Sequence, residues 1–114
     1  MNEFRQKTLE YRMKESQRLK CKYFDRVPVV IKSGNEQTPS TQNFKYLVPK
    51  TATVAEFVSV IRRMTQLKPY QAIFVFVDGV LPPNSSTMLS VYDEHHDEDG
   101  FLYIMYSLEN TFGN

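Results

Sequence analysis

The chain has 114 residues, a length typical of one domain that buries roughly 65% of its unfolded surface and needs no disulfide to hold its core. Its single cysteine, Cys21, excludes an intramolecular disulfide, and no apolar stretch approaches the length of a transmembrane helix. Because the sequence also shows no secretory signal, we expect a cytoplasmic protein whose membrane contact, if any, comes from a surface or an added lipid.

The net charge of +1 conceals an asymmetry. Residues 1–22 carry seven Lys/Arg and three Asp/Glu, a net +4, whereas the remaining residues carry seven and ten, a net −3. This arm has no Gly or Pro and mixes basic with apolar residues, which predicts one or two weakly amphipathic helices. The favoured interpretation is a solvated helix face; the alternatives are contact with an acidic peptide, anionic lipid or a microtubule. Nucleic acid is not expected, because no binding motif is present.

The next elements in chain order predict a hairpin and a helix. Residues 27–32 and 44–49 have strand composition and are separated by a polar loop, and Pro49 favours an edge position for the second strand. Residues 53–56, Thr-Val-Ala-Glu, form a capping box that starts a helix. At helical spacing this helix is expected to bury four apolar side chains: Val54, Phe57, Ile61 and Met64.

The remaining elements complete a β-β-α-β-β-α-β order, which is typical of a β-grasp. Residues 73–77 are an apolar strand, and Asp78-Gly79 predicts a tight turn into a strand at 80–81. Residues 87–95 predict a short helix with Met88, Leu89 and Tyr92 inward, followed by a solvated acidic loop over 93–99. One helix covers only one face of such a sheet, so we expect the N-terminal arm to cover the other.

The last strand, residues 101–106, is apolar on both faces, which is typical of a strand inside a covered sheet. It leads directly into residues 107–114, which are mostly polar and end in Phe112-Gly113-Asn114. A central strand followed by an accessible penultimate glycine suits a protein that is joined to something through its C-terminus. Polar tails are common, so the tail alone is not diagnostic.

Several short strings occur together in this order. They are Asp25-Arg26-Val27-Pro28-Val29, Lys45-Tyr46-Leu47-Val48-Pro49, Phe57 with Ile61-Arg62, Pro82-Pro83, Glu94-His95-His96, Phe101-Leu102-Tyr103-Ile104 and Phe112-Gly113. From residue 11 to residue 114 the chain resembles the autophagy ubiquitin-like modifiers, the family of GABARAP and the microtubule-associated light chains. The resemblance implies an α+β, ubiquitin-like β-grasp with a mixed four-to-five-stranded sheet and two additional N-terminal helices. It divides one domain into an arm (1–23), a core (24–106) and a tail for processing and conjugation (107–114).

The function that the resemblance implies is that of a covalent tag, not of an enzyme, and it requires no cofactor or metal. A processing cysteine protease would cut after Gly113 and release Asn114. Activating and conjugating enzymes would then pass Gly113 to phosphatidylethanolamine, which would hold the protein on autophagosome and vesicle membranes. There it would recruit autophagy receptors that carry an aromatic-x-x-aliphatic motif.

The resemblance also implies a peptide site along residues 45–48, whose backbone would pair with the receptor motif. Its aromatic pocket corresponds to Glu15, Leu19, Pro28, Lys45, Leu47 and Phe101. Its aliphatic pocket corresponds to Tyr46, Val48, Pro49, Phe57, Val60 and Ile61. Arg26, like Lys45, would attract acidic residues beside the motif. Core packing alone would explain Phe57 and Ile61, but it explains Lys45 and Tyr46 poorly.

Four positions depart from the family pattern. Met64 replaces a basic residue beside the aliphatic pocket, and Ala52 replaces a larger aliphatic residue, which is expected to widen that pocket. Gly100 replaces an aromatic residue and is expected to loosen the start of the last strand, while Phe24 replaces a proline. Residues 1–9 match poorly, so no function is assigned to them.

Other functions remain open at this stage. The chain is alternatively a modifier joined to protein lysine, or a β-grasp peptide-binding adapter that is never conjugated. A Cys/His hydrolase using Cys21 with His95 or His96 lacks the sequence context of a nucleophile. A metal site at His95-His96 among Asp93, Asp97 and Asp99 is disfavoured because neighbouring helical side chains diverge by about 100°.

Overall fold

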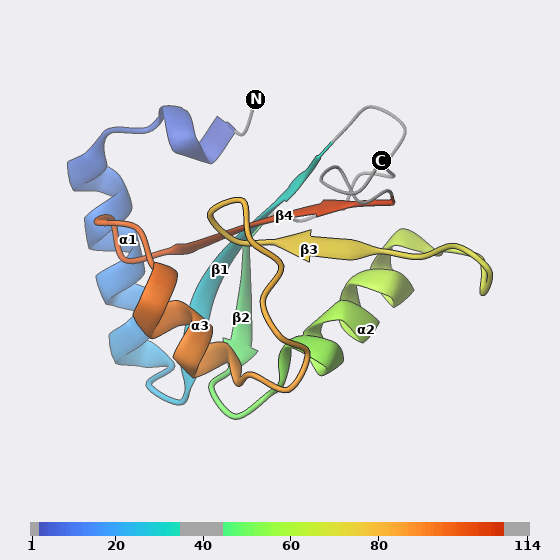
Figure 1. Cartoon of the computed structure of the whole chain (residues 1–114). Helices are drawn as coiled ribbons and strands as arrows, with labels where there is room; N and C mark the ends of the chain where they lie inside the picture. Colours follow the sequence, from blue (N-terminus) through green and yellow to red (C-terminus); the bar gives the residue numbers. More distant parts are fainter. Residues whose placement is uncertain (1–2, 35–44, 109–114) are drawn as a thin grey trace.

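The computed structural model describes residues 3–34 and 45–108, which form a mixed four-stranded sheet with helices on both faces (Figure 1). The strands are β1 (Arg26–Ser33), β2 (Lys45–Pro49), β3 (Phe74–Phe76) and β4 (Leu102–Ser107), in the spatial order β2-β1-β4-β3. β1 pairs antiparallel with β2 and parallel with β4, and β4 pairs antiparallel with β3. The predicted hairpin is therefore confirmed, with its second strand at the edge of the sheet.

The predicted strand at residues 80–81 is wrong. Asp78 and Gly79 do form a tight turn with positive φ angles of 52° and 76°, and the backbone N–H of Val77 donates to the Val80 carbonyl at 2.8 Å. Pairing stops at this bridge, because Pro82 follows closely and has no N–H to continue it. Val80 consequently remains 56% exposed.

Helix α2 (Val54–Thr65) starts where the capping box predicts. The Thr53 side chain accepts a hydrogen bond from the Glu56 N–H at 3.1 Å, and the Glu56 carboxylate accepts one from the Thr53 N–H at 2.9 Å. The predicted core residues of this helix are buried except for Met64, which is only half-buried. Thr65 takes the last buried position, where its hydroxyl donates to the Ile61 carbonyl at 2.8 Å.

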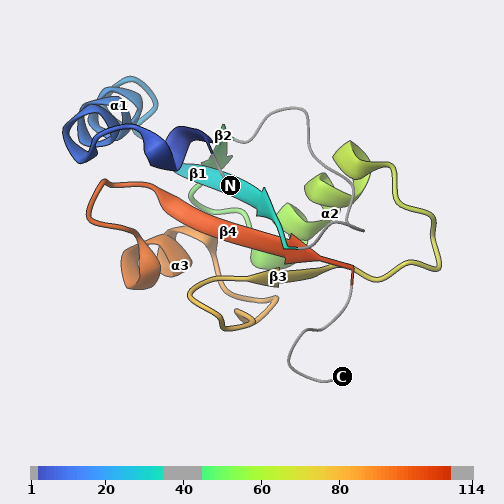
Figure 2. The same cartoon turned by 90° about the horizontal axis from the view of Figure 1, so that it is seen from above.

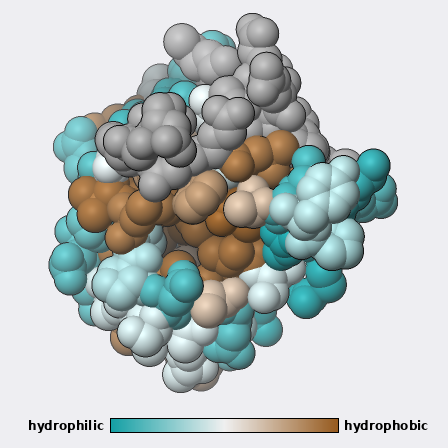
Figure 3. All heavy atoms as spheres, turned by 45° about the vertical axis from the view of Figure 1, so that its right-hand side comes forward, coloured by the Kyte–Doolittle hydropathy of each residue, from teal (hydrophilic) through white to brown (hydrophobic). Residues whose placement is uncertain are grey.

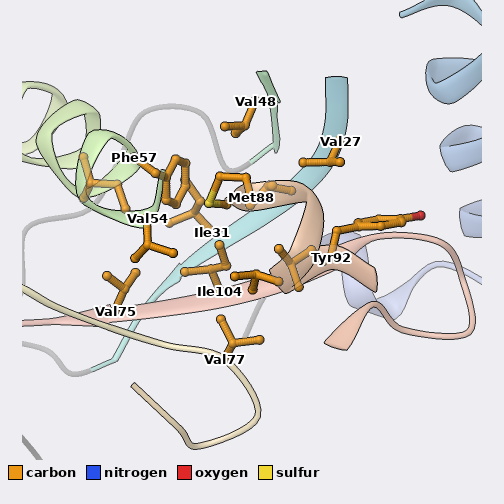
Figure 4. Packing of buried hydrophobic residues seen from close by; sticks show 14 of the residues in the cluster. Val27, Ile31, Val48, Val54, Phe57, Val75, Val77, Met88, Tyr92 and Ile104 are labelled. Atoms are coloured by element: carbon orange, nitrogen blue, oxygen red, sulfur yellow. The ribbon is translucent and has the colours of Figure 1, made fainter. Parts of the chain in front are cut away.

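Helix α3 (Met88–His95) covers the same face of the sheet as α2. Its N-cap Thr87 accepts a hydrogen bond from the Ser90 N–H at 3.2 Å. Met88 and Tyr92 are buried as predicted, but Val91 is the third buried residue and Leu89 is only half-buried. Side chains of both helices meet those of β1, β3 and β4 in one core (Figure 4).

The second face of the sheet is covered by the N-terminal helices, η1 (Glu3–Gln6) and α1 (Leu9–Lys22), as Figure 2 shows. Phe4 of η1 packs with Val30 and Phe101, and its ring lies 4.9 Å from the Phe101 ring in an edge-to-face arrangement. Leu19 of α1 also contacts this cluster. β1 and β4 are thus apolar on both faces because both faces are packed.

The acidic loop is partly buried, which corrects the expectation of a solvated segment. The Asp99 carboxylate is fully buried and lies 2.7 Å from the Arg12 guanidinium of α1, which is itself only 12% exposed. It also accepts hydrogen bonds from the Phe101 N–H and the Tyr103 hydroxyl. Burial of an acidic group is tolerated here because its oxygens are paired with a cation and with hydrogen-bond donors.

Gly100 allows α1 to lie close to this loop. A Cβ at Gly100, whose φ is +90°, would collide with the Ser16 side chain. The Ser16 hydroxyl in turn donates to the Asp99 carbonyl at 2.5 Å. The glycine therefore belongs to a tight helix–loop contact rather than to a loosened start of β4.

Some large apolar side chains lie at the surface of the described residues. Phe24 and Tyr70 are 77% and 79% exposed. On the side of the molecule that holds α2 and the segment before β3, hydrophobic atoms gather at the surface, with hydrophilic atoms beside and below them (Figure 3). Among the described residues, no helix combines the length and apolarity needed to cross a bilayer.

Candidate peptide-binding site

Edge strand β2 presents alternate side chains to two different helices. In the β1–β2 register, Lys45 and Leu47 lie opposite Val30 and Pro28, while Tyr46 and Val48 lie opposite Val29 and Val27. Val30 belongs to the cluster covered by η1 and α1, whereas Val27 and Val29 belong to the core under α2 and α3. Since directly opposed residues share a face, successive residues of β2 face α1 and α2 in turn.

The first groove lies between α1 and β2 and has a volume of about 250 Å³. We call it the α1 groove. Its lining comes from three separate parts of the sequence: Glu15, Arg18, Leu19, Lys45, Tyr46, Leu47 and Phe101. The structure thus brings together every residue predicted for the aromatic pocket except Pro28, which is buried in β1 beside Leu47.

Charged side chains border the α1 groove. Arg18, which was not predicted, donates to the Glu15 carboxylate at 2.5 Å, and this hydrogen bond holds the pKa of Glu15 below its ordinary value. The i, i+3 spacing of Glu15 and Arg18 is the sequence signal that would have found the pair. The Lys45 ammonium lies 3.9 Å from the Glu15 carboxylate and 4.8 Å from the centre of the Phe4 ring. Lys45 therefore ties the site to η1 and α1.

The second groove lies between β2 and α2, has a volume of about 490 Å³, and is called the α2 groove below. It is lined by Arg26, Tyr46, Leu47, Val48, Pro49, Ala52, Glu56, Phe57, Ser59, Val60 and Arg63. All residues predicted for the aliphatic pocket line it except Ile61, which is 0% exposed and packs in the core. Its lining combines apolar side chains with the charged residues Arg26, Glu56 and Arg63.

Of the two departures from the family pattern that were expected to affect the α2 groove, only one lies in it. Ala52 lines it, whereas Met64 packs against the core and is not part of its lining. Arg26 lines it as well, and its guanidinium donates to the Leu47 carbonyl at 3.3 Å. Arg63 and Glu56 were missed because their exposed positions on α2 look like an ordinary solvated helix face.

The groups considered for catalysis or metal binding lie apart from these grooves. Cys21 is exposed and lines a groove with Gly100, whereas His95 lines a different groove and pairs with Asp78 at 2.8 Å. His96 pairs instead with the Tyr92 carbonyl, also at 2.8 Å. Within residues 3–34 and 45–108, no group of three or more potential ligands is arranged to hold a metal ion. The predicted processing and conjugation residues, Gly113 and Asn114, lie outside the described residues.

Comparison with known proteins gives a consistent result. The family model of the autophagy protein Atg8, described as ubiquitin-like, matches residues 11–113. The chain is 51% identical to autophagy-related protein 8a of Arabidopsis thaliana over 93% of its length and 88% of that protein. It is 52% identical to autophagy-related protein 8 of Emericella nidulans, over 92% of its length and 90% of that protein.

Two solved structures share the fold. The crystal structure of Trypanosoma brucei ATG8 matches with a TM-score of 0.87 and 33% identity, covering 94% of each chain. Plasmodium falciparum Atg8, in complex with an Atg3 peptide from that organism, matches with a TM-score of 0.86 and 30% identity, covering 96% of this chain and 98% of the other. These likenesses confirm the predicted ubiquitin-like β-grasp, and with the family match they show that the chain belongs to the Atg8 family of autophagy ubiquitin-like proteins.

Proposed function

We propose that this autophagy ubiquitin-like modifier is trimmed after Gly113 and joined through that glycine to phosphatidylethanolamine on autophagosome and vesicle membranes. There it recruits receptors that carry an aromatic-x-x-aliphatic motif, and it acts as a tag rather than as a catalyst. The observation that carries the peptide-binding part is that edge strand β2 lies between two grooves on opposite faces of the sheet.

The spacing of the motif agrees with this arrangement. A peptide that extends the sheet beside β2 places residues i and i+3 on opposite faces, about 10 Å apart along the strand. One anchor then enters the α1 groove against Leu47 and Phe101, and the other enters the α2 groove against Val48 and Phe57. An even spacing would direct both anchors to the same face and leave one groove empty.

The conjugation part of the proposal rests on the C-terminal sequence and on the relatives. Gly113 has no Cβ, which leaves its carbonyl open to attack in the narrow channels of a protease and of conjugating enzymes. The Plasmodium falciparum relative binds an Atg3 peptide, which supports a conjugating enzyme as a partner of this chain. A phospholipid carries two acyl chains, and two chains give stable anchoring where one does not.

Titration calorimetry with a synthetic aromatic-x-x-aliphatic peptide tests the peptide site. Leu47→Ala should weaken binding by about 1–3 kcal/mol, because Leu47 adjoins both grooves. Leu81→Ala is the matched control, since Leu81 is exposed and lines neither groove. Equal affinities of wild type and Leu47→Ala would reject this site.

Fractionation of starved cells tests the conjugation. In protein made without Asn114, the wild-type Gly113 should direct the chain to the membrane pellet and to a faster-migrating band, whereas Gly113→Ala should leave it unconjugated in the supernatant. Intact mass separates the alternatives, because a lipid adduct, an adduct on another protein and an unmodified chain differ in mass. Equal pelleting of both forms would reject attachment through Gly113.

A further inference from the structure

Residues 68–71, between α2 and β3, form a tight turn, which we call the 68–71 turn. The N–H of Gln71 donates to the Lys68 carbonyl at 3.0 Å, with Pro69 and Tyr70 at the tip. The side-chain oxygen of Gln71 in turn accepts a hydrogen bond from the Lys68 N–H, also at 3.0 Å. The turn is therefore closed by two hydrogen bonds between its first and last residues.

Helix α2 fixes this turn from outside. The Arg62 guanidinium donates to the Gln71 carbonyl at 2.6 Å, and to the carbonyls of Lys68 and Pro69 at 3.1 and 3.3 Å. One side chain thus holds three backbone carbonyls of a four-residue segment. Because the turn is tied to α2 in this way, its tip is presented in one orientation, and a preorganised surface loses less conformational entropy when it binds.

The tip of the 68–71 turn exposes an aromatic side chain. Tyr70 is 79% exposed, and Pro69 and Ala72 are exposed beside it. The second central position of a turn usually holds a small polar residue or glycine, and an aromatic ring there adds little to the packing of the fold. Tyrosine is instead enriched where one end of a side chain meets an apolar phase and the other meets water.

The charge around the tip has one sign. Residues 57–77 include three basic residues, Arg62, Arg63 and Lys68, and no aspartate or glutamate. Lys68 is exposed and immediately precedes the tip. An exposed aromatic ring next to exposed positive charge is complementary to an anionic membrane surface, where rings lie at the level of the headgroups and basic residues are attracted by phosphate.

The 68–71 turn lies at the end of the sheet from which the C-terminal tail leaves (Figures 1 and 2). Phe74, four residues after Tyr70, pairs with Ser107, the last residue of β4. Four residues span at most about 14 Å, and residues 108–113 span at most about 20 Å. A lipid joined to Gly113 would therefore bring a bilayer to the end of the molecule that presents Tyr70.

We propose that the 68–71 turn is a membrane-contact site. When the chain is anchored through Gly113, the Tyr70 ring inserts at the interface between bilayer and water, and the Lys68 ammonium lies against anionic headgroups. The proposal rests on the function proposed above and adds a second contact, which orients the domain on the membrane. The partner is the lipid surface itself.

Tryptophan fluorescence on vesicles tests the proposal, because the chain has no tryptophan of its own. Tyr70→Trp places a single reporter at the tip of the turn. A hexahistidine sequence added after Asn114 holds the full chain on vesicles of phosphatidylcholine, phosphatidylinositol and a nickel-chelating lipid. On these vesicles the emission should shift to shorter wavelengths, and bromine on the acyl chains should quench it. Release of the protein with imidazole should reverse both effects.

Two matched controls accompany this reporter. Phe24→Trp places the same probe at a residue that is 77% exposed, two residues before β1, whose other end lies beside Tyr106 of β4. Its emission should stay unshifted and unquenched on the vesicles. In the Tyr70→Trp protein, Lys68→Gln should lower the ratio of membrane-docked to undocked tips about fivefold, whereas Lys14→Gln, at an exposed cation of α1, should not.

The possible results are distinct. Emission from residue 70 that stays unshifted and unquenched on the vesicles would overturn the proposal, and so would equal quenching of the two reporters. A shift without quenching would place the tip against a protein neighbour, such as a second copy of the chain, and would overturn it as well. The histidine anchor bypasses Gly113, so none of these results bears on the proposed function, which fails separately if Gly113→Ala pellets like wild type.

Discussion

Phe4 joins the N-terminal turn η1 to the sheet, so Phe4→Ala tests whether the arm is part of the fold. The side chain is 4% exposed, contacts the Phe101 ring edge-to-face, and lies under the Lys45 ammonium. Burial of a phenylalanine contributes about 1.5–3 kcal/mol, and an aromatic pair adds about 0.5–1.5 kcal/mol. We expect the free energy of unfolding to fall by about 2–4 kcal/mol, and Tm by about 8–15 °C for a domain of this size.

Guanidinium denaturation followed by far-UV circular dichroism measures this change. Phe24→Ala is the matched control, because it deletes the same side chain at a position that is 77% exposed, and its effect should stay within about 0.5 kcal/mol. Since Phe101 and Lys45 line the α1 groove, Phe4→Ala should also weaken binding of the aromatic-anchored peptide. Coincident denaturation curves for wild type and Phe4→Ala would mean that the arm does not stabilise the sheet.

Two further predictions concern the network that holds α1. Asp99→Ala leaves the Arg12 guanidinium without its closest carboxylate, and in chemical denaturation it should lower the free energy of unfolding by about 3–5 kcal/mol. The control Glu98→Ala, at the exposed neighbouring residue, should lower it little. Similar losses of stability in both variants would contradict the paired burial of Asp99. Burial, followed by its hydrogen bond to Asp99, raises the pKa of Tyr103. The contribution of the protonated Tyr103 hydroxyl to the free energy of unfolding is therefore complete below the ordinary pKa of about 10, and it is lost as the pH rises through the higher pKa of the folded state. In a spectrophotometric titration of the tyrosines, Tyr103→Phe should remove tyrosinate absorbance from the alkaline end of the curve. Loss of absorbance from the beginning of the curve instead would refute a raised pKa of Tyr103.

Elements with local signals were predictable from the sequence. The capping box at Thr53 and the helical spacing of the residues after it predicted α2, since both depend on neighbours within one or two turns. The strand predicted at residues 80–81 is wrong because strand formation depends on a partner elsewhere in the sequence. Beyond the Val77–Val80 bridge, the residues after Val80 pair with no strand of the described sheet, and Pro82 and Pro83 have no N–H to offer a partner.

The buried Asp99 shows the same limit for a charged residue. Its environment depends on Arg12, 87 residues earlier in the chain, and on the approach of α1 that Gly100 permits. From the local sequence alone, residues 93–99, with three aspartates, two glutamates and two histidines, are typical of a solvated loop. Only the assembled fold shows that one of them anchors the arm.

The site was predicted largely from family resemblance, and helical periodicity explains only part of the error at Ile61. Ile61 lies seven residues after Val54 and four after Phe57, on the stripe of α2 that faces the core. Phe57 lies on the same stripe and still lines the groove, whereas Ile61 is 0% exposed and does not. Val60 is offset by one residue and borders the groove instead. The helical spacing therefore separates Val60 from the core stripe, but it does not distinguish Ile61 from Phe57, which only the assembled fold does.

The two grooves depend on the arm to different extents. The α1 groove is assembled from α1, β2 and Phe101, and the Arg12–Asp99 pair and Phe4 hold these parts together. The α2 groove is built within residues 26–63, without any residue of the arm. Loss of the arm's packing should therefore abolish recognition of the first anchor while leaving the second groove in place. Because the two anchors lie on one peptide, a substitution at Phe4 or Asp99 would weaken receptor binding without altering the α2 groove.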